Sequence, residues 1–325
     1  MKKLLLIFIA IISFVDARAQ LFPTLGQQRV GISTAEFLKI GVGSRATAMG
    51  ETFIAISNDV TALYWNPAGL AQFDKDEIIF SHNAWVVDIN HDFLGGVYHF
   101  DEQNSIGVAL TSLSTADMKV TTEFAPGGTG EYFSYRDLAL AVSYSRKMTD
   151  KFSFGGTIRY IDETLAKLKM RGVMIDLGTY YWTGLGTTRF AVTVSNFGNQ
   201  LAPDGKVVLV GKRENSEWQS FSPPTVFRIG FAFEPYQNED NRITASVQLN
   251  HPNDNSENLS TGFEYSWKNI VMFRGGYKFN VDEQNYSFGF GVYVPIRIAL
   301  CSVDYSFTNF TRLGNAQRFS ITLGF

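Results

Sequence analysis

Residues that could perform catalysis are few in this chain, and their spacing does not bring them together. Ser81, His82 and Asn83 supply the residue types of a nucleophile, a base and an orienting group. If this segment is a strand, neighbouring side chains point to opposite faces, so the three cannot converge. His91 and Asp92 follow on the next expected strand, and we expect His82 and His91 to face each other across a hairpin. The sequence therefore predicts two histidines at the rim of a sheet and no enzyme.

Metal and cofactor sites are not predicted either. The four histidines and the single cysteine, Cys301, lack the spacing of a metal-binding motif. Residues 250–257 have the Asn- and Asp-rich composition of a calcium loop, but not its spaced glycine or its bidentate glutamate. The sequence has no glycine-rich phosphate loop, and a net charge of -3 does not favour nucleic acid as a partner. We expect no cofactor and no metal, so the function must be sought in the fold.

Alternating segments dominate the chain and define the elements that carry these residues. Apolar residues alternate with small, polar or charged residues in six clear segments: 137–145, 152–160, 227–234, 243–249, 271–279 and 286–294. The last strand alternates in the same way and ends at Phe325. In a transmembrane β-barrel the apolar face meets lipid and the mixed face lines the lumen. In a soluble sandwich, which is the alternative, the mixed face would meet water.

The lengths of the connections favour the barrel. About fourteen strands can be counted, the first at about residues 76–85, and the two longest connections, 114–132 and 198–223, fall at the same end. Outer-membrane barrels have short periplasmic turns and longer outside loops. Near residues 300–303 the alternation changes phase, which predicts a bulge or a misplaced strand boundary. The predicted fold is all-β: a 14-stranded antiparallel transmembrane β-barrel over residues 76–325.

The N-terminal residues predict export. Lys2 and Lys3 precede an apolar run over 4–15, and the small residues Ala17 and Ala19 then flank Arg18 as in a cleavage site. These are the features of a signal peptide, so we expect cleavage after Ala19 and an outer-membrane location. The apolar run is too short for a spanning helix, which needs about 20 residues. An uncleaved anchor or a buried helix is the alternative.

A segment without alternation lies between the signal peptide and the barrel. Residues 41–50 are rich in small side chains, which allow close backbone packing, and Asn58 or Asp59 is expected to cap a helix. We predict that residues 20–75 contain a lumen hatch in which Arg45 pairs with a carboxylate of the barrel wall, such as Asp176 or Glu264. The alternative is a periplasmic cap or linker outside the barrel.

The same segment resembles the N-terminal signature of the PorV/PorQ family, outer-membrane proteins related to the FadL fatty-acid transporters. The resemblance lies in residues 37–50, 58–59 and 62–70. The expected hatch motif consists of Arg45, Asn58, Asp59, Trp65, Asn66, Pro67, Ala68 and Gly69. The resemblance implies a fourteen-stranded barrel with a hatch, and a role in type IX secretion.

The resemblance also implies protein partners, namely the secretion translocon, attachment components or the C-terminal domains of cargo, besides the surrounding membrane lipids. Five aromatic residues of the longest connections are candidate contacts: Phe124, Tyr132, Phe133, Trp218 and Phe221. They would otherwise belong to the aromatic girdle of the membrane. The alternative function is FadL-like transport of long-chain fatty acids or other hydrophobic molecules, which requires an apolar pocket near the hatch.

Overall fold

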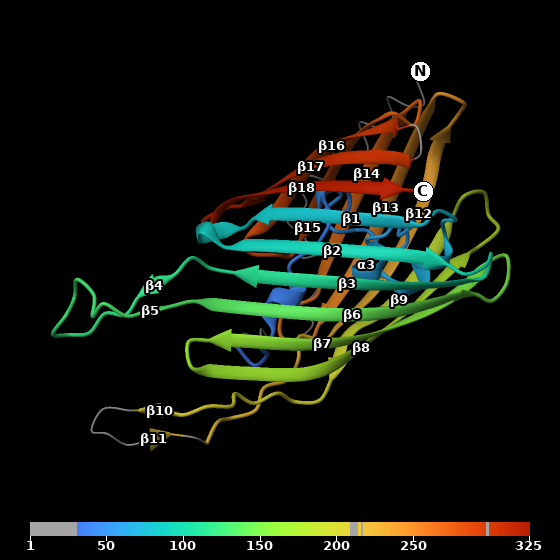
Figure 1. The fold of residues 1–325 in the computed structure, drawn as a ribbon. Coiled ribbons are helices and arrows are strands. Elements are labelled where there is room, and N and C mark those ends of the chain that lie inside the picture. Colours follow the sequence, from blue (N-terminus) through green and yellow to red (C-terminus); the bar gives the residue numbers. More distant parts are fainter. Residues whose placement is uncertain (1–30, 209–213, 216, 297–298) are drawn as a thin grey trace.

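The barrel predicted from the alternation is present. The computed structural model describes residues 31–208, 214–215, 217–296 and 299–325, and fourteen of its strands form a closed antiparallel barrel (Figure 1). The predicted signal peptide, residues 1–19, lies outside the described residues. The barrel strands are β1 (Glu77–Ala84), β2 (Asn90–His99), β3 (Asn104–Ser114), β6 (Tyr135–Lys147), β7 (Phe152–Leu165), β8 (Leu168–Trp182), β9 (Arg189–Gly198), β12 (Val226–Gln237), β13 (Asn241–Pro252), β14 (Asn258–Trp267), β15 (Val271–Phe279), β16 (Gln284–Ile296), β17 (Ala299–Phe310) and β18 (Gly314–Gly324).

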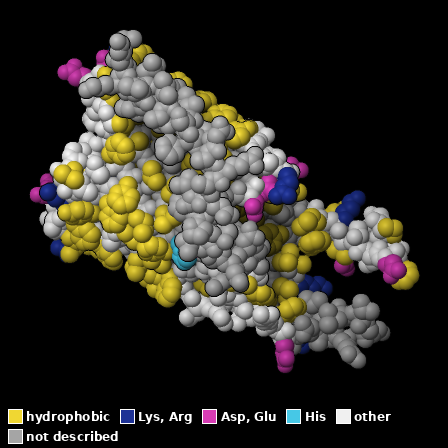
Figure 2. All heavy atoms as spheres, turned by 180° about the vertical axis from the view of Figure 1, so that it is seen from behind, with side chains coloured by type: hydrophobic (Ala, Val, Ile, Leu, Met, Phe, Trp, Pro, Cys, Tyr) yellow, Lys and Arg dark blue, Asp and Glu magenta, His cyan; other side chains and the backbone are white. Residues whose placement is uncertain are grey.

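The two faces of the wall differ in the way that the alternation predicts. On β16, Phe288 and Phe290 point outward and are half exposed, whereas Ser287 and Gly289 point inward and are buried. Figure 2 shows that hydrophobic side chains gather on the barrel wall and that charged side chains lie mostly toward its ends. No helix among the described residues combines the length and the hydropathy of a membrane span. The apolar outer belt has the composition of a surface that meets lipid.

The two ends of the barrel are unlike. At the end that holds the C-terminus, which we name the short-turn end, neighbouring strands are joined by brief turns such as 148–151. The opposite, long-loop end carries two excursions that project beyond the wall (Figure 1). The first arm (115–134) contains β4 (Met118–Lys119) and β5 (Tyr132–Phe133), and the second arm (199–225) contains β10 (Val207–Val208) and β11 (Glu214–Asn215). The predicted division into short and long connections is therefore correct.

Of the two explanations expected for the phase change near residues 300–303, the misplaced strand boundary is correct and the bulge is wrong. Strand β17 pairs without a register shift along both neighbours across residues 300–303, so it has no bulge there. The phase seemed to change because Leu300, an apolar residue, faces the lumen beside the hatch. The strand expected at about residues 296–308 in fact starts at Ala299.

The core of the molecule is inside the barrel. Residues 34–72, which we name the hatch, contain η1 (Glu36–Lys39), α2 (Ser44–Ala48), α3 (Ala62–Trp65) and η2 (Pro67–Ala71) and pack against the lumen face of the strands. A further short helix, η3 (Val86–Asp88), lies in the β1–β2 connection. Phe53 and Trp65 are fully buried between hatch and wall. The expected cap at Asn58 or Asp59 is displaced: Thr61 precedes α3, and Asp59 accepts a hydrogen bond from the Thr61 backbone N–H at 2.9 Å.

Candidate functional site

Two pairs of glycines hold the hatch against the wall. Gly155 on β7 lies opposite Gly178 on β8, and Gly262 on β14 lies opposite Gly276 on β15. All four face the lumen. A Cβ atom on the first pair would collide with Asn66 and with the backbone of Pro67, and one on the second pair would collide with the backbone at residues 49–50. Only glycine lets two backbones approach this closely, so these pairs act as cradles for the hatch.

The first cradle receives the Asn-Pro-Ala part of the hatch motif. The Asn66 side-chain amide donates to the carbonyl oxygen of Ile54 at 2.9 Å and to that of Thr179 on β8 at 3.1 Å. Its Oδ1 accepts from the Ala68 N–H at 3.1 Å and so caps η2, where Pro67 occupies the first position. The Ser153 hydroxyl on β7 donates to the Ala68 carbonyl at 2.9 Å. The motif therefore binds two adjacent strands through atoms that would otherwise be buried without partners.

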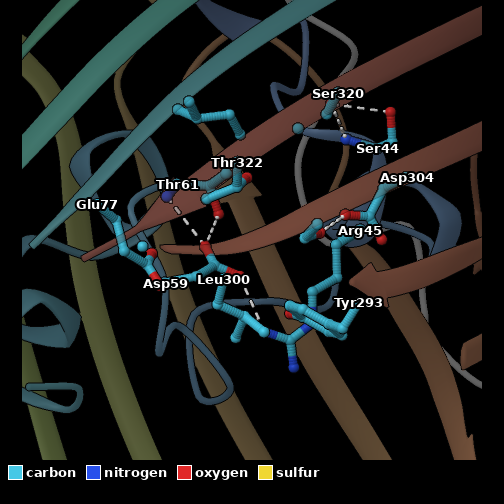
Figure 3. Close-up of a pocket in the computed structure, with 14 residues that line it drawn as sticks. Ser44, Arg45, Asp59, Thr61, Glu77, Tyr293, Leu300, Asp304, Ser320 and Thr322 are labelled. Atoms are coloured by element: carbon cyan, nitrogen blue, oxygen red, sulfur yellow. Dashed lines mark hydrogen bonds and ion pairs between the residues drawn. The ribbon is translucent and has the colours of Figure 1, made fainter. Parts of the chain in front are cut away.

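Arg45 joins the hatch to the other side of the wall. Its Nε and Nη2 donate to the two carboxylate oxygens of Glu264, each at 2.9 Å, and its Nη1 donates to Asp59 and Asn58 at 2.8 Å (Figure 3 shows the Arg45 region). Of the two predicted carboxylate partners, Glu264 is correct, whereas Asp176 pairs with another arginine. Burial disfavours the charged form of Arg45, but Glu264 and Asp59 outweigh burial and raise its pKa well above the ordinary value.

The ion pairs continue into the wall. Glu264 also accepts from Nε of Arg274 at 2.7 Å, and Arg274 pairs with Asp304 on β17. Arg274 and Glu264 are almost completely buried. A buried guanidinium that donates to two carboxylates forms strong, directional hydrogen bonds. Asp59, Arg45, Glu264, Arg274 and Asp304 thus form one chain from hatch to wall.

Little space remains between this chain and the wall. The cavity in Figure 3 has about 30 Å³ and is lined by Asp59, Glu77, Tyr293 and Leu300 among others. That volume accommodates about one water molecule. A more polar pocket of about 200 Å³ opens at the short-turn end, where Arg189 binds Glu234 through two 2.7 Å hydrogen bonds. The hatch therefore leaves little free space against β16–β18.

The predicted contact residues of the first arm are displayed to solvent. Phe124, at the tip, is 95% exposed, the highest value among the described large hydrophobic side chains, and Tyr132 is 59% exposed. Phe133 is half-buried. The first arm projects beyond the end of the barrel (Figure 1), away from the wall where a membrane girdle would be. The first arm thus presents apolar side chains that no described residue covers.

The second arm packs its aromatic residues more closely. The Trp218 Nε1–H donates to the Gly205 carbonyl at 2.9 Å, and Phe221 exchanges two backbone hydrogen bonds with Leu201. Leu201 in turn fills the space above Gly172 on β8. Trp218 and Phe221 are half-buried, so their rings stabilise the arm itself.

The histidines do not form a catalytic group. His82 points outward and pairs with Asp92 at 2.7 Å, while Ser81 and Asn83 point into the lumen. The expected His82–His91 contact is wrong because the register sets Asn83 opposite His91, and a shift of one residue turns a side chain to the other face. The described residues contain no cluster of three or more His, Cys, Asp or Glu that could hold a metal.

Sequence reasoning found the hatch half of this site but only Glu264 of the wall half. The glycines of both cradles stand on the mixed faces of clear alternating segments or their neighbours, so their positions were a usable signal. The arginine at 274 and the aspartate at 304 stand on those faces too. Which residues meet across the lumen depends on strand tilt and register, which the pattern of one strand does not contain.

Comparisons with known proteins agree with this geometry. The profile of a family described as type IX secretion system protein PorV matches residues 24–252. No curated protein sequence matches the chain. Among solved structures, the chain is similar to the toluene transporter TodX of Pseudomonas putida (TM-score 0.56, 14% identity, 92% of this chain and 99% of that one). It is also similar to the toluene transporter TbuX of Ralstonia pickettii (0.56, 13%, 87% and 97%) and to a FadL homologue of Pseudomonas aeruginosa (0.56, 11%, 87% and 98%). At these identities the likeness establishes the fold.

Proposed function

Since the chain belongs to the PorV family and forms an outer-membrane β-barrel, we propose that it serves type IX secretion by binding protein partners at its long-loop end. In this proposal the long-loop end faces the outside of the cell, and the signal peptide is removed after Ala19. The outer belt binds membrane lipids, and the protein performs no catalysis. The partners are the translocon, attachment components or the C-terminal domains of cargo.

One observation carries the proposal: the lumen holds a tightly seated hatch, whereas the first arm is open to solvent. A Cβ on any of the four cradle glycines would collide with the hatch, and Arg45 ties the same hatch to Glu264. A barrel filled in this way is better suited to act through its surface than through its lumen. Exposed aromatic residues such as Phe124 and Tyr132 are the type that dominates binding energy at protein interfaces.

Affinity capture tests the proposal. The full-length protein and a Phe124→Ala, Tyr132→Ala double variant are captured from native outer membranes, and co-purifying secretion components are quantified. We expect the amount of those components recovered with the double variant to be at least tenfold lower. Leu185→Ala is the matched control, because Leu185 is 76% exposed at the short-turn end. Equal recovery from all three proteins would refute the role of the first arm.

A second candidate function is transport of hydrophobic molecules, and one pocket favours it. About 200 Å³ of mostly apolar space lies at the long-loop end, lined by residues that include Leu165, Leu168 and Pro203. Transport needs a movable hatch, so a disulfide can separate the two functions. The hydroxyls of Ser44 on the hatch and Ser320 on β18 lie 2.9 Å apart. Oxidised Ser44→Cys, Ser320→Cys protein should retain partner capture in our proposal and lose uptake of fatty acids in the alternative.

A further inference from the structure

Two carboxylates face each other on the lumen side of β6 and β7. Asp137 stands directly opposite Glu163 in the register of these strands, near the long-loop end. Asp137 is completely buried, and Glu163 is 6% exposed. Neither oxygen of Asp137 has a hydrogen-bond partner among the described residues. Like charges directly across a strand pair repel each other, and burial without partners adds to the cost.

Other carboxylates buried between the hatch and the wall have a cation. Asp176 pairs with Arg159 at 2.7 Å, Glu51 with Lys278 at 2.5 Å, and Glu264 with two arginines. In the part of the chain that the structure describes, no Lys, Arg or His forms an ion pair with Asp137 or Glu163. The pair therefore lacks the countercharge that Asp176, Glu51 and Glu264 have.

The polar groups around the pair carry oxygen atoms that can act as metal ligands. The Thr34 hydroxyl lies 3.3 Å from Oε2 of Glu163, and the Tyr135 hydroxyl lies 3.5 Å from its Oε1. With the four carboxylate oxygens, these hydroxyls make six oxygen atoms from Thr34, Tyr135, Asp137 and Glu163. Hard divalent cations bind such sets, and Ca²⁺ accepts six to eight oxygen ligands in flexible geometry.

We propose that Asp137 and Glu163 bind a calcium ion, with the hydroxyls of Thr34 and Tyr135 as further ligands. The apolar pocket of about 200 Å³ at the long-loop end is lined by Thr34, Tyr135 and Glu163 and gives the ion a path to the site. A bound ion neutralises the facing carboxylates and ties the start of the hatch to β6 and β7. This site does not depend on the secretion role or on the first arm.

Calcium binding to the purified full-length protein tests the site directly. The protein in detergent is stripped with EDTA and titrated with CaCl2 by calorimetry, and in parallel with Tb³⁺, whose luminescence is excited through Tyr135. Calcium sites of extracellular proteins have dissociation constants of about 0.1–1 mM, and we expect this range. Asp137→Asn and Glu163→Gln should each weaken binding at least tenfold.

Asp162→Asn is the matched control, because Asp162 is next to Glu163 on the same strand but points outward to Arg171. It should bind calcium as the unaltered protein does. Heat-dependent gel mobility shows whether each variant keeps its barrel, and the unaltered protein is informative even if a variant does not fold. Lack of calcium binding by the unaltered protein, or equal binding by Asp137→Asn, would overturn the site; the two carboxylates would then share a proton.

Discussion

The hatch and the first arm place their aromatic residues in opposite surroundings: those of the hatch are buried, and that at the tip of the arm is exposed. Phe53 of the hatch is fully buried, with the guanidinium of Arg45 5.2 Å from its ring centre. Phe124 of the first arm is almost fully exposed and contacts no ring or cation among the described residues. The arm is a narrow ribbon held by a few backbone hydrogen bonds, such as the one from the Val120 N–H to the Glu131 carbonyl at 2.9 Å.

Because of this difference, substitutions in the hatch should change the stability of the protein, whereas substitutions in the first arm should change its binding. Each hatch residue is fixed by several neighbours, so a change there costs folding energy whatever the protein binds. A change at the tip of the arm costs almost no folding energy, and its effect must appear in binding.

The largest effect is expected at a cradle. Gly155→Ala introduces a Cβ against the backbone of Pro67, which cannot move without leaving β8. We expect a loss of about 3 kcal/mol or more, above the usual cost of overpacking because backbone opposes backbone. The loss should appear as a lower unfolding temperature of the barrel, which is read from heat-dependent gel mobility.

The adjacent glycine provides the control. Gly156 points outward, and a Cβ there would lie 3.5 Å from Leu177, an ordinary contact. Gly156→Ala should leave the unfolding temperature nearly unchanged. If both variants unfold alike, the hatch is not held by the cradle.

Removing the centre of the ion-pair chain should have the next largest effect. Glu264→Gln leaves Arg45 with Asp59 and Arg274 with Asp304, so neither arginine is left alone. We therefore expect a loss of about 2 kcal/mol, less than the roughly 3–5 kcal/mol for an unpaired buried charge. Denaturant unfolding measures this loss. Arg171→Gln breaks an exposed pair and should leave the free energy of unfolding nearly unchanged; a similar loss in both variants would contradict the role of Glu264.

The fold could be predicted from the sequence because a two-residue period records the face of every strand. Seven strands follow clearly from that pattern, and the count of about fourteen also used the connection lengths of outer-membrane barrels and the family resemblance. The exceptions are places where an apolar residue faces the lumen, as Leu300 does, because periodicity cannot distinguish an apolar lumen from lipid.

The site could be predicted only in part. Charge on a mixed face identified Glu264 as a possible partner of Arg45, but the choice between Glu264 and Asp176 requires the closed barrel. The Asp137–Glu163 pair was within reach, since the tight turn at 148–151 fixes the register of β6 and β7. It was missed because each acid, taken separately, looks like an ordinary lumen residue.

A smaller effect is expected where the hatch meets the β13–β14 connection. Lys39 pairs with Asp254 at 2.7 Å. Burial opposes the charge on Asp254, but the hydrogen bonds from Lys39 and Ser33 outweigh it and lower its pKa below 3.8. Asp254 and Glu36 raise the pKa of Lys39 above 10.5, against the effect of burial. The contribution of the pair is therefore lost as the pH falls below about 4, where Asp254 is protonated, or rises above about 10.5, where Lys39 loses its charge.

A spin label on residue 255 tests this window. In a Cys301→Ser background, Asn255→Cys carries the label, and its mobility is followed by electron paramagnetic resonance from pH 7 to pH 3. We expect an increase in mobility only below about pH 4, because Asp254 stays ionised above its lowered pKa. The additional change Asp254→Asn should give the mobile spectrum already at pH 7. An increase near pH 6 would contradict the assignment.

The smallest effect on stability is expected at the tip of the first arm. Phe124→Ser removes an aromatic ring that is 95% exposed, so the free energy of unfolding should change by no more than about 0.5 kcal/mol. Phe53→Ala removes the same ring type from the hatch, where Phe53 packs edge-on against Trp65, and should cost about 3–5 kcal/mol. Partner capture should decrease with Phe124→Ser although the barrel is unchanged. If Phe124→Ser destabilised the barrel as Phe53→Ala does, the arm would be part of the folding core and the separation of stability from binding would be wrong.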